Sequence, residues 1–126
     1  MALESKKKNK KDVIRTALHG LKNAFQREFS LHLILGSMVI CIGLGCFFQI
    51  SLVEWSFTIL LLGLMMAIEL MNSSIEAVVD LVSPAIHPLA KIAKDTASAA
   101  EAVFASISFV SFCLIFIPKI VDYIMW

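Results

Sequence analysis

The chain has 126 residues, of which 59% are hydrophobic, and its mean hydropathy is +0.84. Soluble domains are about 45–50% apolar, so this composition excludes an ordinary soluble domain of this size. The formal net charge of +1 indicates no overall field that would attract nucleic acid, and three cysteines without paired spacing argue against a disulfide framework or a zinc site.

Lysines crowd the start of the chain, and we expect residues 1–12 to form a basic polar tail. From about residue 13 to residue 28, apolar side chains recur at helical spacing. These are Ile14, Leu18, Leu21 and Phe25. Arg15, His19, Lys22 and Gln26 share another face of the same helix. A basic amphipathic helix before a membrane span usually lies in the interface, so we predict a surface helix here.

Three apolar stretches follow, and each is long enough to cross a bilayer, which takes about 20 helical residues. We predict spans at about 31–50, 55–82 and 93–117, and we treat residues 13–126 as one domain. Ser51 to Glu54 reads as a tight turn. Two prolines, Pro84 and Pro88, are expected to separate the second span from the third, and Pro118 to end the third.

Basic residues indicate the orientation. They gather in the N-terminal tail and, as Lys91 and Lys94, in the second connection, whereas residues 50–55 contain neither Lys nor Arg. The excess of Lys and Arg on cytoplasmic segments predicts a cytoplasmic N-terminus and a C-terminus outside.

The second span ends in an unusual polar face. At about 100° per residue, its polar side chains fall on one side of the helix. They are Glu69, Asn72, Ser73, Glu76 and Asp80. Ionisable residues are costly inside a membrane, so this face is a candidate functional site.

The predicted topology brings five carboxylates to one level of the membrane, with Lys22 and Lys94 nearby. The five are Glu28, Glu69, Glu76, Asp80 and Asp95. Neighbouring carboxylates repel one another unless a cation lies between them, and Mg²⁺ usually takes one or two carboxylates together with substrate phosphates. A third carboxylate could then act as a general base on a hydroxyl, which is the arrangement of phosphoryl transfer.

Two other interpretations of this face stay open from the residues alone. It could be a solvated acidic helix face, or Glu69 could be the carboxylate of a small proton-coupled transporter. Only twelve residues of uncharged, largely apolar sequence, 57–68, precede Glu69 in the second span. Glu69 would therefore lie at a shallow depth in the membrane, which favours chemistry at the interface. No glycine-rich P-loop motif is present, which excludes an ATP site of that kind.

The stretch Glu69-Leu-Met-Asn72-Ser-Ser-Ile-Glu76-Ala-Val-Val-Asp80 resembles the signature of the small prokaryotic diacylglycerol kinase family, which includes the undecaprenol kinases of Gram-positive bacteria. Ala93-Lys94-Asp95 and Ser98-Ala-Ala extend the resemblance, which covers about residues 15–119. Three further stretches are similar to the Gram-positive branch. These are Val79-Asp80-Leu81-Val82, His87-Pro88-Leu89-Ala90-Lys91 and Ile117-Pro118-Lys119-Ile120.

The resemblance implies an all-α integral membrane protein with three transmembrane helices and an N-terminal surface helix. It also implies a homotrimer with active sites shared between neighbouring subunits, located in the bacterial plasma membrane. The implied activity is transfer of the γ-phosphoryl group of ATP, with Mg²⁺, to the hydroxyl of undecaprenol or, in a diacylglycerol kinase proper, of diacylglycerol.

The resemblance also implies residue roles. Glu69 would be the general base, and Asn72 would orient the site. Glu28 and Glu76 would hold the metal ion on the ATP phosphates, and Lys94 would neutralise phosphate charge. The remaining nucleotide contacts would be Thr16, Ala85, Ile86, His87 and Asp95. Ser98 would border the lipid hydroxyl beside Glu69.

Two positions depart from the family pattern. A two-residue gap would place Gln26, rather than Glu28, at the metal-binding position, but the ungapped register preserves the spacing to Glu69. Glu101 stands where relatives tend to have an apolar residue. An unpaired carboxylate there would cost about 2–3 kcal/mol on insertion scales, so we predict that it faces the bundle interior or interfacial water.

Overall fold

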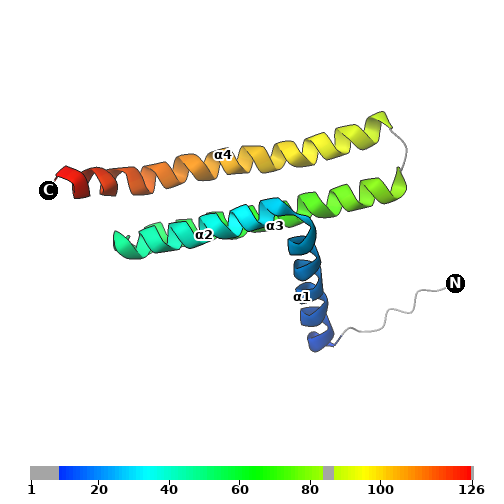
Figure 1. Cartoon of the computed structure of the whole chain (residues 1–126), viewed down its shortest axis with the longest axis horizontal. Helices are drawn as coiled ribbons and strands as arrows, with labels where there is room; N and C mark the ends of the chain where they lie inside the picture. Colours follow the sequence, from blue (N-terminus) through cyan, green and yellow to red (C-terminus); the bar gives the residue numbers. More distant parts are fainter. Residues whose placement is uncertain (1–8, 84–86, 126) are drawn as a thin grey trace.

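The computed structural model describes residues 9–83 and 87–125, and within these ranges it is an all-helical fold. The helices are α1 (Lys10–Arg27), α2 (Phe29–Phe47), α3 (Leu52–Val82) and α4 (Pro88–Met125). Helices α2, α3 and α4 run alongside one another, while α1 projects from them at a steep angle (Figure 1). Most of the predicted basic tail lies outside the described residues.

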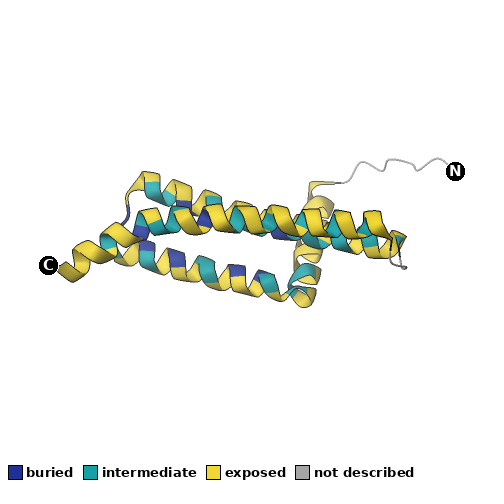
Figure 2. Ribbon diagram, turned by 90° about the horizontal axis from the view of Figure 1, so that it is seen from above, coloured by how far each residue is buried: buried dark blue, intermediate teal, exposed yellow. Residues whose placement is uncertain are grey.

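Helices α2, α3 and α4 are each long and apolar enough to cross a membrane. Large apolar side chains remain exposed along all three. Figure 2 shows that exposed residues, in yellow, occur along the whole length of these helices. Examples are Leu33, Val39, Ile40, Phe57, Leu60, Val103, Phe109 and Leu114. Such an extensive apolar surface is unfavourable in water and suits contact with lipid. The prediction of an all-α protein with three helices of membrane-spanning length is therefore confirmed.

The corner between α1 and α2 is formed by a single residue, Glu28, whose backbone is extended (φ −107°, ψ 112°). Phe25 and His32 pack edge to face across this corner, with ring centroids 5.5 Å apart. The corner therefore turns α1 away from the bundle and places the Glu28 side chain beside α3.

The turn between α2 and α3 has well-defined caps at both helices. Gln49 adopts a left-handed conformation (φ 49°), and the amide of Ile50 donates to the carbonyl of Gly45 (3.1 Å), which is a Schellman ending. Ser51 and Glu54 then form a reciprocal capping box. Helix α3 consequently begins at Leu52, three residues before the predicted start of the second span.

Helices α3 and α4 form an antiparallel hairpin with side-chain contacts at both ends and near its middle. Lys94 bridges to Asp80 (2.7 Å), and Lys119 bridges to Glu54 (3.1 Å). Between them, the amide of Asn72 donates to Glu101 (3.2 Å). These pairs fix the register in which the two helices face each other.

Helix α4 extends beyond the expected third helix, 93–117, at both ends. Helix α4 begins at Pro88, because proline suits the first turn, where its missing N–H is not needed. The helix also continues through Pro118 to Met125. Proline lowers helix stability in water, but it is tolerated inside membrane helices where neighbouring groups satisfy the freed carbonyl.

Candidate functional site

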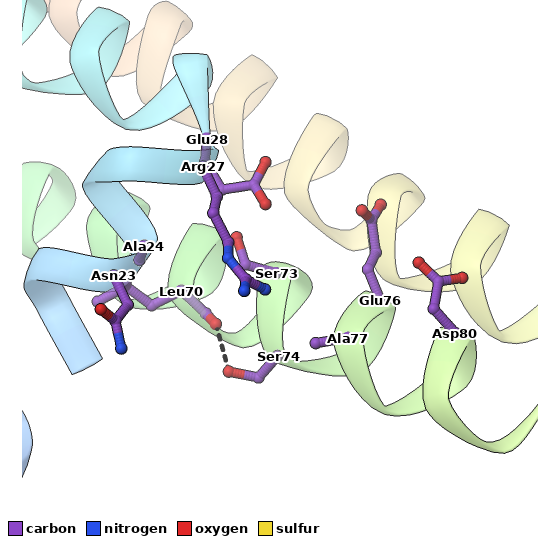
Figure 3. A pocket seen from close by; sticks show the side chains of 10 residues that line it. All are labelled: Asn23, Ala24, Arg27, Glu28, Leu70, Ser73, Ser74, Glu76, Ala77 and Asp80. Atoms are coloured by element: carbon purple, nitrogen blue, oxygen red, sulfur yellow. Dashed lines mark hydrogen bonds between the residues drawn. The ribbon is translucent and has the colours of Figure 1, made fainter. Parts of the chain in front are cut away.

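A pocket of about 350 Å³ lies where α1 and its corner with α2 approach α3. Its walls come from α1, the corner and one face of α3, as Figure 3 shows. The lining residues are Asn23, Ala24, Arg27, Glu28, Leu70, Ser73, Ser74, Glu76, Ala77 and Asp80. The steep angle of α1 creates this space.

The pocket gathers three of the five predicted carboxylates, Glu28, Glu76 and Asp80. Glu76 and Asp80 are one helical turn apart on α3, and Glu28 reaches the same pocket from the corner. Asp80 is paired with Lys94, whereas no Lys or Arg within the described ranges forms a salt bridge with Glu28 or Glu76. Arg27 also lines the pocket and Lys94 interacts electrostatically with Glu76, but neither forms a salt bridge with Glu28 or Glu76. Two neighbouring carboxylates of this kind favour the binding of a further cation.

Glu69 lies two turns before Glu76 on α3 and is only 2% exposed. The hydroxyl of Ser30, at the start of α2, donates a hydrogen bond to Oε1 of Glu69. The other oxygen, Oε2, is buried and has no hydrogen-bond partner among the described residues. A buried carboxylate oxygen without a partner is costly, and such exceptions mark functional positions.

Asn72 lies between Glu69 and Glu76 on the same face of α3. Its Nδ2 donates to Oε2 of Glu101 on α4, at 3.2 Å, while its Oδ1 is buried without a partner in the described part of the chain. The Glu101 carboxyl group is close enough to those of Glu69 and Glu76 to interact with both electrostatically. Glu101, which was expected to face either the bundle interior or interfacial water, therefore faces α3.

Sequence reasoning missed two residues of this region. Arg27 lines the pocket, and its guanidinium reaches into it (Figure 3). Ser30 holds Glu69 from another helix. A basic residue directly before Glu28 was the available signal for Arg27. No local pattern marks Ser30, because its partner is 39 residues away.

Other predicted site residues lie outside this pocket. Thr16 is exposed on α1, where its hydroxyl donates to the carbonyl of Asp12 (2.8 Å). His87 precedes α4, and its Nδ1 accepts from the amide of Leu89 (3.2 Å). Asp95 and Ser98 are exposed on α4. Ala85 and Ile86 lie outside the described residues, and Lys22 is exposed on α1 and is not among the lining residues.

The pocket fits a divalent cation that is bound together with a phosphate ligand. Within residues 9–83 and 87–125, no group of three or more His, Cys, Asp or Glu is arranged to hold a metal ion by itself. Glu28 and Glu76 nevertheless offer hard oxygen donors in one pocket. Mg²⁺ is commonly held by one or two carboxylates and completed by substrate phosphates and water, which is the donor set that these residues would supply.

Comparison with known proteins agrees with this chemistry. The chain matches the family model of prokaryotic diacylglycerol kinase over residues 15–116. It is 43% identical to the undecaprenol kinase of Bacillus subtilis over 96 residues, which cover 75% of this chain and 76% of that protein. It is 42% identical to a diacylglycerol kinase of Helicobacter pylori over 84 residues, covering 67% and 66% of the two chains, respectively. A diacylglycerol kinase of Pseudomonas aeruginosa is 38% identical over 87 residues, covering 69% and 71%.

Three helices of membrane-spanning length, with an acidic pocket and a buried carboxylate on one of them, describe a membrane protein with a candidate catalytic site. The chain belongs to the prokaryotic diacylglycerol kinase family. It is therefore a membrane lipid kinase of bacterial type, and this membership decides between the kinase and transporter interpretations in favour of the kinase.

Proposed function

We propose that this lipid kinase transfers the γ-phosphoryl group of ATP to the hydroxyl of undecaprenol, with Mg²⁺ and at the cytoplasmic face of the membrane. The observation that carries the proposal is the buried Glu69, which has one unpartnered oxygen on the same helix as the acidic pocket. Undecaprenol is preferred because the Bacillus subtilis relative is named for it, and diacylglycerol is the second candidate.

In this proposal Glu69 is the general base. Its free Oε2 accepts the proton of the lipid hydroxyl while the hydroxyl oxygen forms a bond to the γ-phosphorus. The bond from that phosphorus to the bridging oxygen breaks, and ADP leaves. The hydrogen bond from Ser30 holds Oε1 and so limits rotation of the carboxylate. Asn72, one turn along α3, helps to orient the reacting groups.

The acidic pocket would bind the phosphates of ATP. Glu28 and Glu76 would hold Mg²⁺, and the metal ion would offset the negative charge of the β- and γ-phosphates. Lys94 and Arg27 are the cations placed to contact phosphate oxygens, because Lys94 pairs with a pocket carboxylate and Arg27 lines the pocket. Thr16, Ala85, Ile86, His87 and Asp95 would complete the nucleotide site, and Ser98 would contact the lipid.

We also propose that the active protein is a homotrimer with sites shared between subunits. Thr16, Asp95 and Ser98 are exposed and lie outside the pocket that contains Glu28 and Glu76, which is the expected division if one subunit completes the site of another. The mass of the protein in detergent, measured by light scattering, should equal that of three chains. A monomer that retains full activity would contradict the shared site.

Helix α1 is proposed to lie in the cytoplasmic interface. It contains no buried residue, and its apolar face, with Ile14 and Leu18 more than 60% exposed, is free to contact lipid. Basic residues around it suit anionic headgroups. Labelling of a cysteine introduced into the N-terminal tail should occur only in inside-out vesicles. Labelling in right-side-out vesicles would reverse the assigned orientation.

The direct test of function is transfer of labelled phosphate from ATP in detergent–lipid micelles, with undecaprenol and diacylglycerol offered in parallel, with and without Mg²⁺. The proposal expects Mg²⁺-dependent labelling of undecaprenol well above diacylglycerol. Preference for diacylglycerol would be compatible with the proposed mechanism but would contradict undecaprenol as the substrate. No labelling of either lipid by folded protein would contradict the proposed reaction.

A further inference from the structure

Asn72 and Glu101 form a polar contact between α3 and α4 inside the site region, with Nδ2 of Asn72 3.2 Å from Oε2 of Glu101. The contact is partly buried and is formed by residues 29 positions apart in the chain. No role for Glu101 follows from the proposed reaction, and an acidic residue within a helix of membrane-spanning length is costly.

The chemistry of the two groups fixes the orientation of the amide. In the structure Oε2 of Glu101 accepts a hydrogen bond from Nδ2 of Asn72 (3.2 Å), and a carboxamide has one donor end and one acceptor end. Glu101 therefore draws the NH₂ group of Asn72 toward α4.

The acceptor end is consequently left free. Oδ1 of Asn72 is buried and has no partner in the described part of the chain, as is also true of Oε2 of Glu69. Because Asn72 is three residues after Glu69 and four before Glu76, this oxygen belongs to the helix face that carries the proposed base and a proposed metal ligand. A free acceptor there attracts a proton donor or a cation and repels phosphate oxygens.

We propose that Glu101 is a positioning residue that holds the Asn72 amide with its oxygen, and not its NH₂ group, toward the reacting groups. The inference rests on the proposed function, since it concerns the same site. It assigns to Asn72 a contact with a group that carries a proton or positive charge, and it excludes a hydrogen bond from Asn72 to the γ-phosphate.

Exchanging the acid and the amide between positions 72 and 101 tests this orientation of the Asn72 amide. Asn72→Asp alone places two carboxylates together and should lower kcat about 100-fold, within the range of coupling between contacting residues. Glu101→Gln alone should lower kcat about threefold, because its oxygen can still accept the hydrogen bond. In the double variant, the NH₂ group of the new glutamine can donate to the new aspartate, which keeps one oxygen turned toward the site. We expect kcat within about fivefold of the wild type.

The matched control combines Asn72→Asp with Glu54→Gln, the same acid-to-amide change at the far end of the hairpin, and this pair should show no rescue. The melting temperature of each variant separates structure from mechanism. If the swap restores the melting temperature but not kcat, the hydrogen bond is only structural and the inference is wrong. Strictly additive effects on kcat would also overturn it.

The same experiment separates this inference from the proposed function. An active wild type without rescue in the swap overturns the inference alone. A folded wild type that transfers phosphate to neither lipid overturns the proposed function and, with it, this role of Glu101.

Discussion

The two ends of the α3–α4 hairpin are each joined by a salt bridge, but the polar groups around the two salt bridges differ. At each end a lysine of α4 bridges to a carboxylate of α3, Lys94 to Asp80 and Lys119 to Glu54. At the Glu54 end, the carboxylate also completes the capping box with Ser51, so both of its oxygens have partners. The rings of Phe47, Phe48 and Tyr123 pack beside this end.

The Asp80 end contains more carboxylates than the described residues pair in salt bridges. Glu28 and Glu76 share a pocket with Asp80, and further along α3 one oxygen each of Glu69 and Asn72 is buried without a partner in the described residues. Stability alone would favour pairing or removing such groups. The polar groups of the Glu54 end are therefore paired within the fold, whereas the Asp80 end keeps the groups that we propose bind the substrate.

The largest effect should come from removing the proposed base. Glu69→Gln keeps the shape of the side chain and the contact with Ser30 but cannot take a proton. We expect kcat to fall about 1000-fold, the range of general-base contributions, with nucleotide binding retained. Glu54→Gln, the matched change at the other end, should keep kcat within about twofold. Normal turnover in Glu69→Gln would exclude this residue as the base.

Removing Lys94 or Lys119 should show which of the two salt bridges contributes to nucleotide binding and which only to helix packing. Lys94→Ala should raise the KM for ATP about tenfold or more, because a cation near the phosphates is lost. Lys119→Ala should leave both kinetic constants within about twofold. Both bridges are partly exposed, so each melting temperature should change by only about 2 °C. Equal kinetic losses in the two variants would contradict the assigned difference between the ends.

A smaller effect on the kinetics is expected for substitution of Arg27, the residue of α1 that lines the same pocket as Asp80. Arg27→Ala should raise the KM for ATP about fivefold with little change in kcat, and Arg27→Lys should be intermediate because it keeps the charge but not the bidentate geometry. Lys10→Ala, at the exposed start of α1, is the control. If Arg27→Ala and Lys10→Ala behave alike in steady-state kinetics, Arg27 is not a phosphate contact.

The smallest effect on catalysis should follow from a lesion at the Glu54 end. A Cβ atom at Gly45 would lie 2.8 Å from the Trp55 ring and 3.1 Å from Ile50. Gly45→Ala should therefore destabilise the fold by about 1–3 kcal/mol, as overpacking does. Thermal unfolding should show this loss, while kcat per folded molecule stays within about twofold. An unchanged melting temperature would mean that the turn relaxes freely around the added methyl group.

Local sequence patterns predicted most of the helices and half of the site. Apolar runs of membrane length predict α2, α3 and α4, and helical periodicity places Glu69, Asn72 and Glu76 on one face. The ends of α4 were not predictable from its prolines, because their effect depends on position in the helix and on the surroundings.

The remaining parts of the site depend on tertiary geometry. The contact between Asn72 and Glu101 follows from the register of α3 against α4, which no local pattern specifies. Arg27 enters the pocket because of the angle between α1 and α2 at Glu28. No glycine or proline at this corner would allow the angle to be predicted from the sequence. Ser30 reaches Glu69 only through the packing of α2 on α3.

The proposed metal site, formed by Glu28 and Glu76 beside Asp80, would hold the ion together with ATP. Its most direct test is the binding of Mn²⁺, a paramagnetic probe for the Mg²⁺ site, to the purified protein with a non-hydrolysable ATP analogue. Electron paramagnetic resonance would compare the wild type with Glu76→Gln and Glu54→Gln. A ligand role for Glu76 requires that Glu76→Gln weaken Mn²⁺ binding by about tenfold or more and that Glu54→Gln leave it unchanged. Binding by Glu76→Gln that equals the wild type would contradict it.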